Sequence, residues 1–180
     1  DFSTKDCEFG YRESFFKKPE NWQKYLITAV SFKLNKNTHP KTEYESLSKY
    51  LKDNNINDPS LMEVRNAVLV LRKEKLENVN EFGNAGSFFK NPMVEKEIPG
   101  IPSYPFEDKY KLFAGWLIDK AGWKGKLHKG AGVSSKNTLF IINKSGKAKS
   151  SDVKELSQMI IDDVHKKFGV TLEKEVQYIG

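Results

Sequence analysis

The sequence predicts an α+β fold. Segments with the composition of strands and segments with the periodicity of helices follow one another irregularly along the 180 residues, without the regular strand–helix–strand repeat of a parallel sheet. The clearest helical period lies in residues 151–168, and the clearest apolar–polar alternation lies in residues 170–178. A chain of this length holds one domain or two small ones.

The N-terminal half contains one predicted strand and one predicted helix. Residues 25–34 have the β-branched and aromatic composition of a strand, and the polar stretch 35–41 is predicted to be a loop. Ser60 and Glu63 have the spacing of a capping box, so we predict a helix over 61–74. The apolar positions of this helix are Leu61, Val64, Val68 and Leu71.

The middle of the C-terminal half is predicted to hold a connection, a helix and a strand. Residues 92–105 contain four prolines and no clear period, which is typical of a connecting segment. Residues 112–121 have the pattern of a helix that ends at Gly122. Residues 138–143 form a short apolar run typical of a buried strand, and the turn-forming sequence 143–146 follows it.

The end of the chain predicts a helix followed by a strand. Ser151 can cap the helix, and Gly169 ends it. Its apolar stripe consists of Val153, Leu156, Ile160, Val164 and Phe168. In the strand after it, Val170, Leu172, Val176 and Tyr178 share one face, and Glu173, Glu175 and Gln177 share the other.

Composition excludes several classes of protein. The mean hydropathy is −0.63 and 30% of the residues are charged, and no apolar run approaches the roughly 18 residues of a membrane span. The polar N-terminal residues do not resemble a signal peptide. Cys7 stands alone, so no internal disulfide is expected, and a reducing, cytoplasmic location fits. The three histidines lie far apart in sequence, so we expect no metal site.

The net charge of +6 allows three interpretations. It fits a nucleic-acid-binding protein, a lysine-rich solvated surface, or a site for an anionic ligand. The basic run 124–129 is short, is interrupted by glycine and contains no aromatic residue for base stacking. We therefore expect no nucleic-acid partner.

Residues 83–92, GNAGSFFKNP, are the most informative stretch. Glycine permits a positive φ or a close approach to a ligand, and asparagine tolerates the same geometry. The two phenylalanines favour burial and would anchor the loop, so the Ser87 hydroxyl can be presented to a reaction centre. An ordinary structural turn that happens to contain a serine is the alternative.

This stretch closely resembles the signature of the bacterial UDP-N-acetylenolpyruvoylglucosamine reductases of the long-form type. Three further segments resemble that family, in the family's order and spread over the chain: FGYRES at 9–14, KLFAGWLID at 111–119 and LEKEVQYIG at 172–180. The resemblance implies NADPH-dependent, FAD-mediated reduction of UDP-N-acetylglucosamine enolpyruvate to UDP-N-acetylmuramate, a precursor of peptidoglycan.

The resemblance also assigns three catalytic residues. The reaction reduces an enol ether conjugated to a carboxylate, so the protein must donate a proton and stabilise negative charge. Ser87 matches the proton donor, and Arg12 matches the group that binds the carboxylate, for which guanidinium has suitable bidentate geometry. Glu175 matches the third catalytic residue of the family. Without the resemblance, a surface salt bridge is the simpler interpretation of Arg12.

Further positions match ligand contacts of the family. Tyr11 and Arg72 match contacts to the flavin. The matches to substrate contacts are Tyr44, Lys75, Asn91, Tyr104, Lys111 and Asn137. The sequence departs from the family pattern in 130–137, where His and Gln are replaced and Asn137 stands near the position of the Gln.

The resemblance implies that the chain is the C-terminal half of the enzyme, without the N-terminal flavin-binding part that it requires. We therefore expect residues 1–82 to complete the FAD-binding α+β domain, residues 83–169 to form the α+β substrate-binding domain, and residues 170–180 to return to the flavin side as a final strand. The chain alone is expected to be inactive, and the enzyme to be a monomer. A non-catalytic UDP-sugar-binding module is the alternative.

Overall fold

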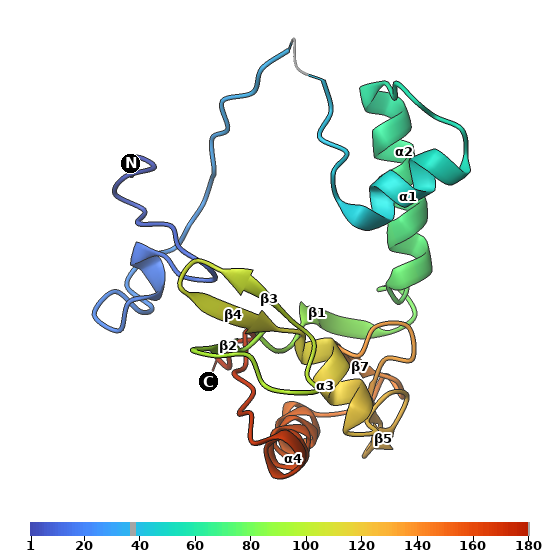
Figure 1. Cartoon of the computed structure of the whole chain (residues 1–180). Helices are drawn as coiled ribbons and strands as arrows, with labels where there is room; N and C mark the ends of the chain where they lie inside the picture. The colour runs from blue at the N-terminus through green and yellow to red at the C-terminus, as the bar shows by residue number, and fades with distance from the viewer. Residues whose placement is uncertain (37–38, 180) are drawn as a thin grey trace. The chain divides into compact units, whose positions relative to one another are not determined.

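The computed structural model describes residues 1–36 and 39–179. The chain divides into two compact units, Asp1–His39 and Pro40–Gly180, which are drawn in Figure 1. The larger unit combines helices with two antiparallel sheets. The predicted α+β class is therefore confirmed.

The smaller unit is organised by aromatic side chains around the 3₁₀-helix η1, Phe15–Lys17. Four rings pack against one another, with centroid distances from 5.1 to 5.8 Å. They belong to Phe2, Phe15, Phe16 and Tyr25. These tilted and edge-on contacts are the favoured geometries of aromatic pairs, so they hold this short segment together.

The strand predicted over 25–34 is absent, and this prediction is wrong. These residues form no strand, and Leu26 and Leu34 are 88% and 85% exposed. β-branched and aromatic residues suit a pleated surface, but a strand also needs a neighbouring strand to bond its backbone. In the loop predicted over 35–41, residues 37 and 38 lie outside the described residues, and the others have no regular structure.

The larger unit begins with two packed helices, α1 (Glu45–Asp53) and α2 (Leu61–Lys75). Helix α2 confirms the predicted capping box: the Ser60 N–H donates to the Glu63 carboxylate at 2.8 Å, and the Glu63 N–H donates to the Ser60 Oγ at 3.3 Å. The small core between the helices contains Leu47, Leu51 and Ala67, with Val64 and Leu71 beside them. Leu61 and Val68, predicted to share this face, are exposed.

The rest of the unit contains two sheets. One has the strand order β1-β7-β6-β5 and the other has the order β2-β4-β3, with antiparallel neighbours throughout. The strands of the first sheet are β1 (Gly83–Ser87), β5 (Leu127–His128), β6 (Ala131–Val133) and β7 (Phe140–Asn143). Those of the second are β2 (Met93–Val94), β3 (Ser103–Phe106) and β4 (Lys109–Leu112).

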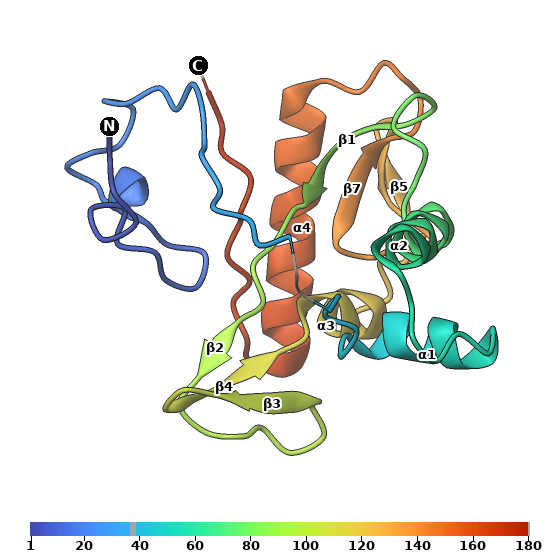
Figure 2. The same cartoon turned by 90° about the horizontal axis from the view of Figure 1, so that it is seen from above.

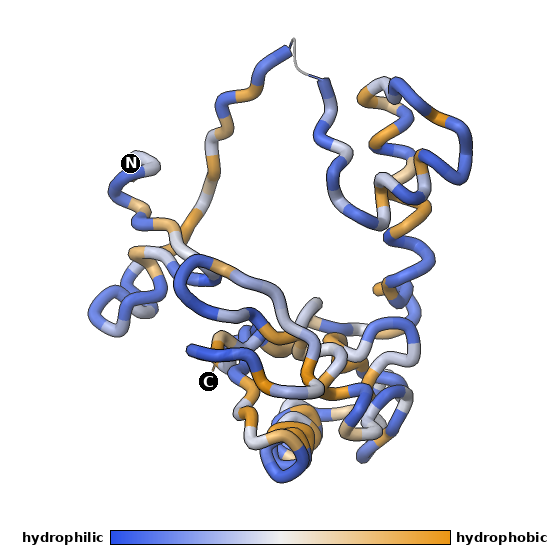
Figure 3. Tube along the Cα trace, viewed as in Figure 1, coloured by the Kyte–Doolittle hydropathy of each residue, from blue (hydrophilic) through white to orange (hydrophobic). Residues whose placement is uncertain are grey.

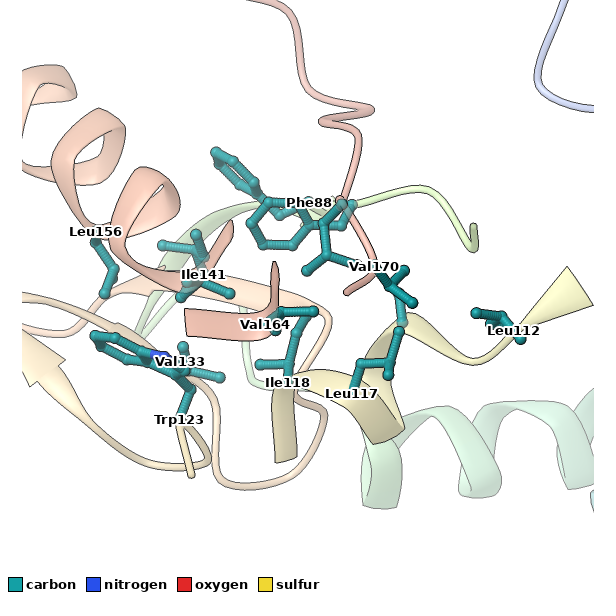
Figure 4. Packing of buried hydrophobic residues seen from close by; sticks show 14 of the residues in the cluster. Phe88, Leu112, Leu117, Ile118, Trp123, Val133, Ile141, Leu156, Val164 and Val170 are labelled. Atoms are coloured by element: carbon teal, nitrogen blue, oxygen red, sulfur yellow. The ribbon is translucent and has the colours of Figure 1, made fainter. Parts of the chain in front are cut away.

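Helix α4 (Ser150–Phe168) supplies one wall of the main core. It contacts β6 and α3 (Ala114–Lys120), and Figure 2 shows it running beside the first sheet. The helix has one hydrophobic and one hydrophilic side (Figure 3). The predicted stripe is confirmed, because Leu156, Ile160 and Val164 are fully buried and the two outer members pack against them. Figure 4 shows their neighbours, which include Phe88, Ile118 and Val170.

Several predicted boundaries are corrected. Residues 92–105 are not a plain connection, because they contain β2 and the start of β3. The helix predicted over 112–121 begins at Ala114, because Leu112 ends β4. The strand predicted from residue 138 begins at Phe140. Strands β2 and β7 pair with segments distant in sequence, which local composition does not reveal, whereas β3 forms a hairpin with the next strand, β4.

The helix ends follow local chemistry more closely. Gly122 and Gly169 have φ of 86° and 68° and lie just after α3 and α4, as predicted. The cap predicted at Ser151 is wrong. Helix α4 starts one residue earlier, and the Asp152 carboxylate accepts a hydrogen bond from the Lys149 N–H at 2.8 Å.

Candidate functional site

The glycine-containing stretch, predicted to be a loop, begins instead as a bulged edge strand, β1, over Gly83–Ser87. Strand β1 pairs with β7, and its register shifts between Asn84 and Ser87. The Asn84 side chain accepts a hydrogen bond from the Gly86 N–H at 3.0 Å, and Gly86 has a φ of 79°. Bulges of this kind use a glycine in the left-handed region and redirect the strand. Ser87 is the half-buried residue that follows the bulge.

Two buried phenylalanines anchor the next turn of the chain. Phe88 and Phe89 are each 2% exposed, and their ring centroids lie 5.1 Å apart. The Phe88 N–H donates to the Leu139 carbonyl at 2.7 Å, and the Phe88 carbonyl accepts from the Glu175 N–H at 2.9 Å. The residue after Ser87 is therefore held on both sides, as expected for an anchored loop.

The C-terminal segment, which bonds to the Phe88 carbonyl, makes further contacts with the residues after Phe88. Phe89 and Lys174 form an antiparallel bridge, and the Lys90 N–H donates to the Glu173 carbonyl at 2.8 Å. The Lys90 ammonium also pairs with the Glu173 carboxylate. The predicted strand over 170–178 is reduced to this one bridge, but its alternation is confirmed, since Val170 and Leu172 are buried.

The backbone of Glu175 thus lies beside that of Phe88, next to Ser87. The structure brings together two of the three predicted catalytic residues, which are far apart in sequence. Arg12 and Tyr11 belong to the smaller unit. There they form the tip of a tight turn, with the Arg12 guanidinium 5.8 Å from the Tyr11 ring centroid.

Three predicted substrate contacts gather at the second sheet. Tyr104 and Lys111 are opposite each other in the pairing of β3 with β4. The Lys111 side chain is buried, and its ammonium lies 3.6 Å from the Phe106 ring centroid and 5.4 Å from that of Tyr104. Such positions stabilise a cation through the ring quadrupole. Asn91 lies nearby and accepts a hydrogen bond from the Ala114 N–H at 2.9 Å, at the start of α3.

The other predicted contacts lie elsewhere in the larger unit. Tyr44 precedes α1 and is 74% exposed, while Arg72 and Lys75 are exposed in the last turn of α2. Asn137 orders its own loop, because its side chain accepts from the Leu139 N–H at 3.1 Å and its carbonyl accepts from the Phe140 N–H at 3.0 Å.

Sequence reasoning missed Ser134 and Glu77. Ser134 is fully buried, and its Oγ donates to the Glu77 carboxylate at 2.7 Å. The same oxygen accepts from the N–H groups of Lys136 and Asn137 at 3.0 and 3.2 Å. These bonds fasten the residue just beyond α2 to the loop before β7. A serine in a polar loop carries no signal of such a role, because its partner lies 57 positions away.

Comparison with known proteins decides the family. A family model described as UDP-N-acetylenolpyruvoylglucosamine reductase, C-terminal domain, matches residues 77–179, which is more than half of the chain. The chain belongs to this family. The matched residues of this chain include Ser87, Glu175 and the buried Lys111.

Reductases of several bacteria are similar over nearly the whole chain. Proteins named UDP-N-acetylenolpyruvoylglucosamine reductase from Bdellovibrio bacteriovorus, Flavobacterium johnsoniae and Burkholderia multivorans are 44%, 39% and 40% identical over 97%, 99% and 97% of it. The chain spans about half the length of these relatives, 53%, 55% and 52%. The solved reductase from Thermus caldophilus is 28% identical, with a TM-score of 0.42, over 67% of this chain and 36% of that one.

Two further properties of the described residues bear on the site. Residues 1–36 and 39–179 contain no group of three or more His, Cys, Asp or Glu side chains placed to hold a metal ion. Within the same residues, no helix has both the length and the apolar character that crossing a membrane requires.

Proposed function

We propose that this chain is the substrate-binding and catalytic C-terminal part of an NADPH-dependent, FAD-containing reductase. The intact enzyme converts UDP-N-acetylglucosamine enolpyruvate to UDP-N-acetylmuramate for cell-wall peptidoglycan in the cytoplasm, as a monomer. The observation that carries the proposal is the junction at Phe88, which holds Ser87 beside Glu175 through the 2.9 Å backbone bond. The family match of residues 77–179 supports it.

The chemistry of the substrate assigns a task to each catalytic residue. The Ser87 hydroxyl donates a proton to the alkene carbon, and the Arg12 guanidinium binds the carboxylate where negative charge accumulates. Glu175 stabilises the same charge distribution or orients Arg12. The rigid backbone around Ser87 keeps its weakly acidic hydroxyl in place, which a proton donor of this kind requires.

The residues of this chain that would contact FAD fit its polar groups. Arg72 presents an exposed guanidinium at the end of α2, and Tyr11 is a half-buried phenol. Both groups donate hydrogen bonds, which suits flavin carbonyl and phosphate oxygens. When bound, FAD supplies the hydride that it receives from NADPH.

The substrate nucleotide would be held by the remaining predicted contacts. The buried Lys111 ammonium is suited to a diphosphate, and Tyr104 and Asn91 lie on the adjoining strands and loops. Lys75, Tyr44 and Asn137 complete the proposed set. We extend the proposal to the domain limits 1–82, 83–169 and 170–180, which the separate core of α1 and α2 supports in part.

The test is turnover by the full-length protein with its own upstream sequence. NADPH oxidation should depend on the enolpyruvyl sugar nucleotide, and UDP-N-acetylmuramate should be the product by mass spectrometry. The 180-residue chain alone should retain little flavin and show little turnover. NADPH oxidation at a rate that does not depend on the enolpyruvyl nucleotide would refute the proposed reaction.

A further inference from the structure

The Lys17 side chain bonds to the turn that carries Arg12. Its ammonium donates to the Arg12 carbonyl at 2.8 Å. At the base of the turn, the Gly10 N–H donates to the Glu13 carbonyl at 3.0 Å, and the Glu13 N–H donates to the Gly10 carbonyl at 3.3 Å. Tyr11 and Arg12 are therefore the two residues at the tip of a short hairpin.

The backbone of this turn is strained at Arg12. Its φ of 58° lies in the left-handed region, which costs a residue with a Cβ about 1–2 kcal/mol. Strain of this size persists only where surrounding contacts determine the conformation. The peptide between Arg12 and Glu13 has such contacts at both ends, because its N–H bonds to Gly10 and its carbonyl bonds to Lys17.

Lys17 is itself held in place. It is the last residue of η1, directly after two rings of the aromatic cluster, and its N–H donates to the Ser14 carbonyl at 3.0 Å. The Phe15 N–H donates to the Cys7 carbonyl at 2.8 Å, and the Asn21 side chain donates to the Phe15 carbonyl at 3.0 Å. The ammonium therefore extends from a fixed base to the tip of the hairpin.

We infer that Lys17 is a positioning residue for Arg12. Its ammonium fixes the plane of the Arg12–Glu13 peptide, and this plane sets the direction in which the Arg12 side chain leaves the backbone. This inference rests on the proposed function, because only there does Arg12 bind the substrate carboxylate. Charge-assisted hydrogen bonds are stronger than neutral ones, so loss of the ammonium weakens the hold on this peptide.

The test uses Lys17→Met and Lys17→Arg in the full-length enzyme, with Lys24→Met as the matched control on an exposed lysine of the same unit. Stopped-flow traces follow flavin reduction by NADPH and flavin reoxidation by the enolpyruvyl nucleotide. Lys17→Met should slow reoxidation about tenfold, in line with the loss of one charged hydrogen bond, and leave reduction unchanged. Lys17→Arg should restore most of the rate. In an Arg12→Ala background, Lys17→Met should cause little further slowing.

Hydrogen exchange tests the same contact without activity. The Glu13 amide should exchange faster in Lys17→Met than in wild type, whereas Lys24→Met should leave it unchanged. Unaltered Glu13 exchange, reoxidation at the wild-type rate, or equal slowing of both half-reactions would overturn the inference. If wild type does not reduce the enolpyruvyl nucleotide, the proposed function fails by itself, and Glu13 exchange still reports whether Lys17 holds the turn.

Discussion

The carbonyl of Phe88 accepts a hydrogen bond from the backbone N–H of Glu175 at 2.9 Å. This bond joins a bulged edge strand to a segment that follows the last helix. It makes the position of Ser87 depend on the backbone at the end of the chain. Because it uses only backbone atoms, the side chains of Ser87 and Glu175 can be changed while the junction stays intact.

Ser87→Ala should separate the two half-reactions of the full-length enzyme. Flavin reduction by NADPH should keep its rate, while reoxidation by the enolpyruvyl nucleotide should slow by about 10²- to 10⁴-fold, the usual contribution of a general acid. Stopped-flow absorbance measures both steps. Ser135→Ala removes an exposed hydroxyl in another loop and should change neither. Unchanged turnover in Ser87→Ala would remove Ser87 as the proton donor and favour the alternative in which this chain contributes UDP-sugar binding only.

Glu175→Gln should also slow reoxidation selectively, because it removes the negative charge of the carboxylate but preserves the backbone bond to Phe88. Steady-state kcat should fall more than kcat/KM for NADPH. Glu173→Gln is the matched control, since Glu173 is two residues away and 70% exposed. A similar loss in both variants would assign the effect to the charge of the segment in general and not to Glu175.

Gly86→Ala should destabilise the protein by about 1–2 kcal/mol, because a Cβ is unfavourable at a φ of 79°. A Cβ at this position meets no atom within 4 Å, so the cost arises from the backbone and not from a clash. Gly83→Ala is the control on the same strand, with equally open space and no positive φ, and should raise the stability by about 0.4–1 kcal/mol. Urea unfolding of both variants compares them. Equal stabilities would mean that the bulge relaxes readily.

The stabilisation that the Glu63 carboxylate gives to the start of α2 should be lost at low pH. Hydrogen bonds from the Ser60 side chain and backbone to the carboxylate hold the pKa of Glu63 below its usual value. Because the pKa is depressed in the folded state, the stabilisation is present above the pKa of an unfolded glutamate, about 4.3. It is lost as the pH falls through the lower folded value.

A ¹³C NMR titration of the Glu63 carboxyl measures this pKa. In Ser60→Ala, which removes the side-chain donor, the pKa should return toward the usual value. A Glu63 pKa that is the same in both proteins would contradict the role of Ser60.

Local sequence was sufficient for the long helices. The capping box of Ser60 and Glu63 predicts the start of α2, and Gly169 predicts the end of α4, because helical hydrogen bonds and caps join residues only a few positions apart. In the stretch 83–92, glycine and asparagine likewise indicated an unusual local backbone geometry. The loop predicted there is instead a strand over Gly83–Ser87, because β7 pairs with it.

Tertiary structure decided what depends on distant partners. Residues 25–34 have strand composition but no strand beside them, whereas Met93–Val94 became a strand through its pairing with the more distant β4. The bond of Ser134 to Glu77 and the junction of Phe88 with Glu175 also join residues remote in sequence. Backbone pairing and buried polar contacts are satisfied by whichever groups the fold brings near. The sequence therefore determined the types of the candidate site residues, and the fold determined which of them meet.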